Sequence, residues 1–232
     1  MISIVNFLGY YLQTEGQLRT SVSNTAFFTA LNVVMVPILA TIFFKEKFSI
    51  KSILAALIAL AGITVLSFDG TTFQFRVGDL LNFLCAICFA IQIASIPSLS
   101  KYESPFALAG IQLTMMGLFS LILIPFFPNA QHFANTAWLS VAYVTFISGF
   151  VCFFGQIVSQ KYVKSSTASL LLGQESFFGA IFSVIIQHAP VTWQLIVGGA
   201  LVILSIIIVS VKFGKKGSLK KNPPTKPQKK RS

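Results

Sequence analysis

The sequence predicts an all-α protein, a polytopic membrane helix bundle of about eight transmembrane helices. Of its 232 residues, 55% are hydrophobic and 10% are charged, whereas soluble domains carry roughly 25% charged residues. Uncharged runs of 17 to 57 residues recur along the chain, and a spanning helix needs about 20 apolar residues. Helices also satisfy their own backbone hydrogen bonds in lipid. These observations exclude a water-soluble globule.

The first four expected helices follow from the charges that separate them. The first begins at the N-terminus and carries Glu15, which weakens its apolar signal. The second and third come from the uncharged runs at 20–44 and 52–68. Asp79 opens the fourth, where a negative group complements the helix dipole. We expect these helices at about 2–18, 24–44, 50–68 and 79–99.

The last four expected helices come from a long uncharged region and the segment after it. The run at 104–160 has 57 residues and is long enough for two spans, with a turn-rich break between Pro125 and Pro128. A second polar break at 187–190 separates the final two. We expect these helices at about 106–127, 137–159, 166–187 and 191–212.

The positive charge is concentrated at the C-terminus. Nine of the 17 Lys and Arg residues lie in 212–232. The net charge of +11 therefore belongs to a basic tail, expected at 214–232 and disordered, and no nucleic-acid partner is predicted. With both termini in the cytoplasm, 15 basic residues lie inside and two, Arg19 and Arg76, lie outside. The positive-inside rule then predicts a multi-pass protein of the cell membrane in this orientation.

Two stretches of sequence are similar to a known family. Residues 21–37 read SVSNTAFFTALNVVMVP, and the chain continues through FKEKFS at 44–49 into a helix that ends near Gly62. In the second half, SSTASLLLGQE at 165–175 and TWQLIVGG at 192–199 repeat this plan. This pattern resembles the EamA-type transporters of the drug/metabolite transporter superfamily. Lys45 stands where that family usually has Gly.

The resemblance implies an inverted repeat. The family has ten helices in a five-plus-five arrangement, and this chain resembles helices three to ten, without the first two. We therefore expect a partial first repeat of three helices at 1–68 and a second repeat of five helices at 69–213. Matched helices are five spans apart, and an odd number means that the two copies run in opposite directions.

Glu175 is the sharpest candidate for function. It is the eleventh of the 23 residues in 165–187, near the bilayer midplane, where a charged group costs about 2.5–3.5 kcal/mol. One hypothesis is that it binds a cationic or amine group of a substrate or carries a coupling proton. The alternative is a protonated glutamate that is hydrogen-bonded within the bundle.

The resemblance also places a substrate cavity between the repeats, with Asn32, Gln92 and Gln156 as lining candidates beside Glu175. For each amide the alternative is an interhelical hydrogen bond. Pro37 is expected to kink its helix.

The predicted function is a secondary transporter, a permease or exporter of small metabolites, amino acids or drugs, with or without proton coupling. The alternative is a truncated or non-transporting membrane protein that needs partner helices, which a homodimer would supply. The expected partners are a small-molecule substrate and the lipid bilayer. An enzyme is not expected, because Glu175 is the only acid deep in a span. Cys85 and Cys88 lack further ligands nearby in the sequence, so neither a metal nor a cofactor is expected.

Overall fold

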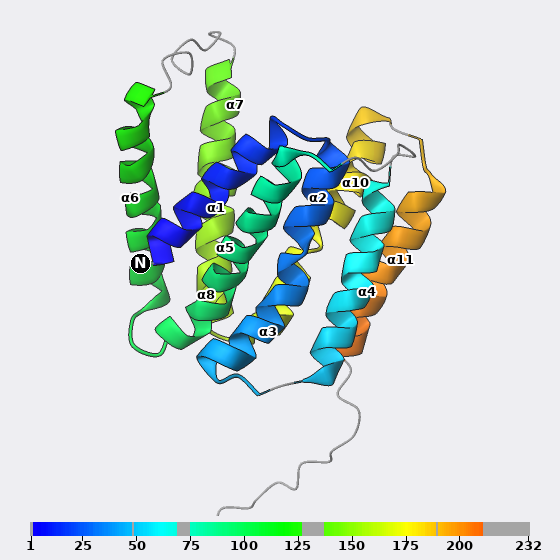
Figure 1. Ribbon diagram of the computed structural model, residues 1–232, viewed down its shortest axis with the longest axis horizontal. Coiled ribbons are helices and arrows are strands. Elements are labelled where there is room, and N and C mark those ends of the chain that lie inside the picture. Colours follow the sequence, from blue (N-terminus) through cyan, green and yellow to red (C-terminus); the bar gives the residue numbers. More distant parts are fainter. Residues whose placement is uncertain (1, 48, 69–74, 127–136, 189, 211–232) are drawn as a thin grey trace, which may run out of the picture.

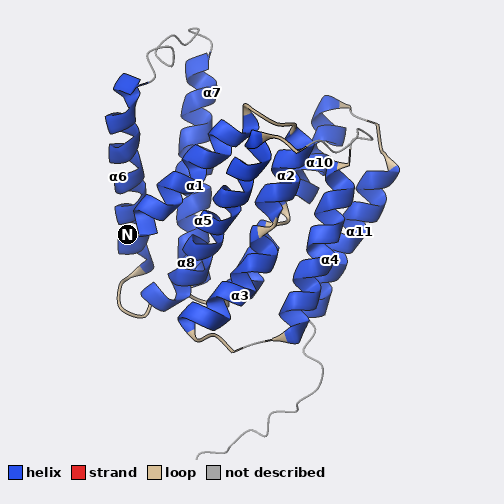
Figure 2. Cartoon of the chain, in the orientation of Figure 1, coloured by secondary structure: helices blue, strands red, loops and turns tan. Residues whose placement is uncertain are grey.

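The described structure is entirely helical. The computed structural model describes residues 2–47, 49–68, 75–126, 137–188 and 190–210, and the described residues contain no strand (Figure 2). This confirms the predicted all-α class. The α-helices are α1 (Ile2–Gln17), α2 (Val22–Ala30), α3 (Asn32–Phe44), α4 (Ile50–Ser67), α5 (Val77–Leu99), α6 (Pro105–Leu123), α7 (Ala137–Tyr143), α8 (Phe153–Gln160), α9 (Ser165–Leu172), α10 (Glu175–Gln187) and α11 (Trp193–Ser210). A short 3₁₀ helix, η1 (Ile124–Phe126), follows α6, and a π-helix, η3 (Val144–Cys152), joins α7 to α8.

Seven helical segments of the described chain are long and apolar enough to cross a membrane. They are Val22–Phe44, Ile50–Ser67, Val77–Leu99, Pro105–Phe126, Trp138–Gln160, Ser165–Ile186 and Trp193–Ser210. The remaining expected span, at 2–18, corresponds to α1, whose 16 residues fall short of the usual spanning length. The expected tail at 214–232 lies outside the described residues.

Three helices that the hydropathy pattern predicts to be continuous are interrupted. The span expected at 24–44 divides into α2 and α3 at Leu31, and the span expected at 166–187 divides into α9 and α10 at Gly173 and Gln174. The span expected at 137–159 contains the π-helix η3. Hydropathy does not report such breaks, because a carbonyl that loses its helical partner can be satisfied by other groups without any change in composition.

Serine side chains fix the starts of several helices. Ser21, Ser49 and Ser104 each accept a hydrogen bond from the backbone N–H three residues later, at 3.1, 3.4 and 3.1 Å. This is the usual N-cap geometry, in which a side-chain oxygen satisfies one of the free N–H groups of the first turn.

Helices α4 and α11 lie side by side through small residues (Figure 1). The buried residues of α4 include Ala55, Ala56, Ala59 and Gly62, and those of α11 include Gly198 and Gly199. A Cβ atom added to Gly62 would lie 2.8 Å from the Gly198 carbonyl oxygen, and one added to Gly198 would lie 2.7 Å from the Gly62 carbonyl oxygen. Small residues at an interface let membrane helices approach until their backbones touch.

A buried carboxylate joins the start of α5 to the start of α2. Asp79 is fully buried, and its oxygens accept hydrogen bonds from Thr20 Oγ1 (2.6 Å), Asn24 Nδ2 (3.2 Å) and the Arg76 backbone N–H (2.7 Å). It lies in the first turn of α5, as predicted, where the helix dipole also favours a negative charge. Asp79 thus holds two helices together.

Replacing Asp79 with alanine is expected to destabilise the protein by at least about 1.5–3 kcal/mol, because three donors lose a charged acceptor. The measurement is thermal unfolding of the purified protein in detergent. Glu103→Ala is the matched control, since Glu103 is exposed and an exposed substitution usually changes stability by less than about 0.5 kcal/mol. Equal melting temperatures for the two variants would contradict this role of Asp79.

The turn after α3 connects the two halves of the chain. Glu46 Oε1 accepts hydrogen bonds from the Ser165 hydroxyl at 2.6 Å and from the Ser165 backbone N–H at 3.2 Å. Lys45, which ends α3, has a φ of 54°, a left-handed conformation that favours glycine. This explains in physical terms why glycine suits the position and why lysine there is strained.

Candidate substrate cavity

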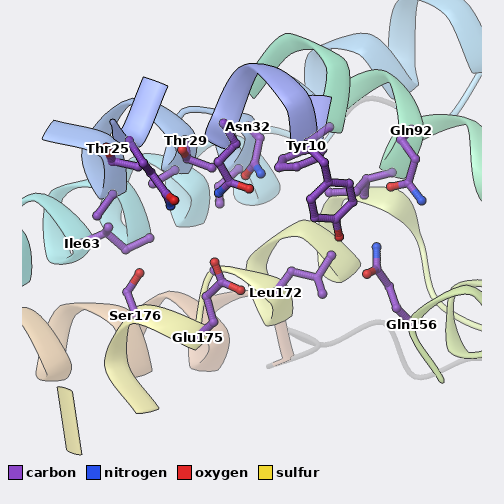
Figure 3. A pocket seen from close by; sticks show the side chains of 18 of the residues that line it. Tyr10, Thr25, Thr29, Asn32, Ile63, Gln92, Gln156, Leu172, Glu175 and Ser176 are labelled. Atoms are coloured by element: carbon purple, nitrogen blue, oxygen red, sulfur yellow. The ribbon is translucent and has the colours of Figure 1, made fainter. Parts of the chain in front are cut away.

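A cavity of about 320 Å³ lies between helices of both halves of the chain. Side chains from α1, α2, α3, α4 and α5 line one part, and side chains from α8, α9 and α10 line the other. In Figure 3, Gln156, Glu175 and Ser176 lie on one side, and Tyr10, Asn32 and Gln92 lie on the other. The cavity is therefore built from segments far apart in the sequence.

Two of the three helix interruptions, those at Leu31 and at Gly173 and Gln174, border this cavity. On one side it is lined by Ala30 and Asn32, which flank the break between α2 and α3; on the other it is lined by Gly173 and Glu175, at the break between α9 and α10. A new helix begins at each break, and the first N–H groups of a helix have no partner within it. Interrupted helices that meet at mid-membrane are typical of substrate and ion sites in secondary transporters.

The side chain of Gln174 stabilises the second interruption. In an unbroken helix the Gln174 backbone N–H would bond to the Leu170 carbonyl, but here it donates to Leu171 O at 3.2 Å. The Gln174 side chain replaces the backbone N–H at the Leu170 carbonyl, because its Nε2 donates to Leu170 O at 3.2 Å. Gln174 is buried, so this bond satisfies a carbonyl that water does not reach.

Gln174→Leu is expected to lower the free energy of unfolding by about 1–3 kcal/mol, because the buried Leu170 carbonyl loses its donor. Thermal unfolding in detergent measures the effect. Gln194→Leu makes the same chemical change at an exposed 3.5 Å contact with the Phe68 carbonyl and is expected to change stability little. A Gln174→Leu protein as stable as the wild type would show that the break does not depend on this side chain.

The structure brings all four predicted lining residues to the same cavity. The Glu175 side chain is solvent-accessible, so its carboxyl group reaches the cavity space. Asn32 and Gln156 are half-buried, while Gln92 is 2% exposed and its Nε2 has no hydrogen-bond partner among the described residues. The four residues therefore line one cavity, and their part in substrate binding remains a prediction.

Pro37 does not line the cavity. It lies buried inside α3, and its carbonyl accepts a hydrogen bond from Thr41 Oγ1 at 2.8 Å. The interruption of this span is at Leu31, ahead of Pro37. A kink at Pro37 itself therefore remains a prediction.

Sequence reasoning missed the contribution of α1 to the cavity. Asn6, Tyr10, Gln13 and Gln17 all line it, at successive spacings of four, three and four residues. This spacing places polar side chains on one face of a helix. The pattern is visible in the sequence, within a segment whose apolar signal is weak.

Helix α2 adds two hydroxyl groups to the lining, those of Thr25 and Thr29. Thr25 Oγ1 accepts a hydrogen bond from Asn82 Nδ2 at 3.1 Å, whereas Thr29 Oγ1 is buried without a partner in the described structure. The described residues hold no group of three or more His, Cys, Asp or Glu side chains that could bind a metal ion.

Comparison with known proteins matches most of this chain to one family. The EamA-like transporter family matches residues 1–68 and 76–211. An uncharacterized transporter of Archaeoglobus fulgidus is 32% identical over 212 residues, which are 91% of this chain and 68% of that protein. A biotin transporter of Escherichia coli K12 is 24% identical over 208 residues, which are 88% of this chain and 70% of that protein.

A solved crystal structure shares the fold. It matches 89% of this chain and 75% of its own, with a TM-score of 0.78 at 17% sequence identity. The family match covers both halves of the sequence, including each interrupted helix, and it confirms the resemblance seen in the sequence. This chain is a multi-pass membrane protein that belongs to the EamA-like transporter family.

Proposed function

We propose that this protein is a secondary transporter that moves a small metabolite across the cell membrane by alternating access. In this proposal Glu175 is the central group that binds the substrate or carries the coupling proton. The observation that carries the proposal is that two interrupted helices meet at one cavity. Glu175 lies at the second interruption, as the first residue of α10. In inverted-repeat transporters, rocking of one repeat against the other exposes such a site alternately to each side.

The cavity chemistry supports a polar substrate with a positive or neutral group near Glu175. Apart from Glu175, the polar lining consists of amide and hydroxyl groups of Asn, Gln, Thr, Ser and Tyr side chains, which both donate and accept hydrogen bonds. The volume of about 320 Å³ is near the small end of the range for ligand sites. Amino acids and small amines fit this size and charge.

Among the described residues that line the cavity, Glu175 carries the only carboxyl group, so substrate and proton would compete for it. A substrate amine bound on one side would displace the proton from Glu175, and release on the other side would allow the proton to return. This exchange would couple export of the substrate to entry of protons. Export is the direction we expect, with both termini in the cytoplasm.

The test is substrate uptake into proteoliposomes that contain the purified chain, with and without an imposed proton gradient. The panel contains labelled amino acids, small amines and biotin, because a biotin transporter is among the relatives. Saturable uptake of a cationic or zwitterionic compound that increases with the gradient is the expected result. Preferential uptake of biotin, an anion, would contradict the assigned role of Glu175 while leaving secondary transport intact.

A further inference from the structure

A second hollow of the molecule collects positive charge away from the substrate cavity. It has a volume of about 850 Å³ and shares no lining residue with the cavity. Five lysines and one glutamate, Glu46, line it, which gives the lining a net charge of +4. The lysines are Lys45, Lys47, Lys101, Lys161 and Lys164.

These lysines come from three separate connections, those between α3 and α4, α5 and α6, and α8 and α9. The positive-inside rule requires basic residues near the ends of spans, but it does not require them to converge on one concavity. Like charges that share a hollow repel one another across distances shorter than the Debye length. A bound anion would remove this repulsion.

Within the described residues, none of the five lysines forms an ion pair. The one carboxylate in the lining, Glu46, already accepts two hydrogen bonds from Ser165. Lys161 lies over the Tyr162 ring, with its Nζ 5.9 Å from the ring centroid. Among the described residues, the lining therefore keeps an excess of positive charge, and its ammonium groups form no ion pair with a carboxylate.

A buried hydroxyl group in the same hollow also lacks a partner. Ser100 lines the hollow and is only 8% exposed, and its Oγ has no hydrogen-bond partner in the described part of the chain. Its backbone N–H is already bonded to the Ile96 carbonyl at 2.9 Å. Since buried hydroxyl groups normally form hydrogen bonds, the Ser100 hydroxyl is an unpartnered donor in the wall of the hollow.

We propose that this hollow is a binding site for a phosphate group, either in the headgroup of an anionic phospholipid or in a free phosphate compound. Lysine ammonium groups bind phosphate oxygens as point charges, and basic pockets between membrane helices on the cytoplasmic side bind anionic headgroups. In the predicted orientation the hollow faces the cytoplasm. The Ser100 hydroxyl would complete the set of donors.

The experiment measures binding of phosphatidylglycerol, phosphatidylcholine and inorganic phosphate to the purified full chain in detergent, by native mass spectrometry and thermal shift. Lys101→Gln and Lys164→Gln each remove one charge from the hollow, and each should weaken phosphate binding about fivefold. Lys51→Gln is the matched control, because Lys51 is exposed in the first turn of α4 and does not line the hollow.

The ligand pattern distinguishes the two sources of phosphate. Binding of phosphatidylglycerol alone identifies a lipid site, binding of inorganic phosphate alone identifies a soluble anion site, and binding of both identifies recognition of the phosphate group itself. Each result supports the proposal if the two hollow variants weaken the binding and Lys51→Gln does not. Equal losses in all three variants, or no binding of either ligand, would overturn it.

Ser100→Ala provides an independent test of the hydroxyl group. Removing a buried hydroxyl that has no protein partner should not destabilise the ligand-free protein, and a small rise in melting temperature is expected. Phosphate binding should nevertheless weaken severalfold, because one donor is lost. Unchanged affinity in Ser100→Ala would contradict the part assigned to this side chain.

Discussion

Glu175→Gln is expected to weaken substrate binding roughly 10- to 160-fold while the protein inserts and folds normally. The substitution keeps the size of the side chain and one acceptor oxygen, replaces the other oxygen with an NH2 donor, and removes the ability to carry a negative charge. A hydrogen bond to a charged group contributes about 1.5–3 kcal/mol, and each 1.4 kcal/mol is a factor of ten in affinity. Substrate uptake into proteoliposomes and binding to the detergent-purified protein measure the effect.

Two transport modes separate binding from coupling. If Glu175 carries the coupling proton, Glu175→Gln should lose its response to an imposed proton gradient. Exchange of labelled for unlabelled substrate without a gradient should then survive better than gradient-driven uptake. If Glu175 only holds the substrate amine, both modes should fall by the same factor.

Glu103→Gln is the control for this experiment. It makes the same chemical change at an exposed residue outside the cavity and should leave transport at the wild-type level. A Glu175→Gln protein that transports as well as this control would reject Glu175 as a binding or coupling group. The cavity would then need another explanation for its single acidic side chain.

Gly198→Leu is expected to destabilise the fold by about 1–3 kcal/mol or more, as overpacking of a tight interface does. A Cβ atom at this position would lie 2.7 Å from both the Gly62 carbonyl oxygen and the Leu66 Cγ atom. The carbonyl is backbone, so it cannot rotate away as a side chain would, and α4 and α11 must separate. A lower melting temperature in detergent, by several degrees, is the expected result.

Gly110→Leu is the matched control for Gly198→Leu. Gly110 also lies inside a helix, but a Cβ atom there would meet nothing within 4 Å, so the leucine side chain points into open space. Because glycine is a poorer helix former than leucine by up to about 1 kcal/mol, this control should be neutral or slightly stabilising. Equal losses in both variants would indicate that glycine is needed for flexibility rather than for close packing.

A double substitution tests whether the two glycines form one contact. Once Gly198→Ala has pushed the helices apart, Gly62→Ala should cost less than it does alone, because residues in direct contact are not additive. Additive losses would show that each glycine acts separately.

Much of the architecture is encoded in composition and charge. Uncharged runs, bounded by residues such as Arg19, Asp79 and Lys101, define where the chain crosses the membrane, because charged groups are costly in lipid and cheap in water. The residue pattern around 21–49 and 165–199 was enough to indicate the family. The positions of the spans depend on the free energy of transfer from water to lipid, which each segment contributes largely independently of its neighbours.

The sequence also identified candidate cavity residues without showing where they lie relative to one another. Asn32, Gln92, Gln156 and Glu175 stood out because polar groups inside a span are costly, but cost alone does not show which of them face each other. The structure places them around one cavity and adds the α1 face that includes Tyr10. Which amides share a cavity depends on how the helices rotate and cross, and packing against neighbours decides this.

The positions of the helix breaks and the hydrogen bonds between distant loops are known only from the tertiary structure. At the interruption, the Gln174 side chain replaces its own backbone N–H at the Leu170 carbonyl, and hydropathy does not report this exchange of hydrogen bonds. Glu46 accepts a hydrogen bond from the hydroxyl of Ser165, 119 residues further along the chain. The sequence by itself thus determined which segments enter the membrane, because burial in lipid depends on local composition. The structure decided which polar groups meet, because that depends on contacts between segments distant in the chain.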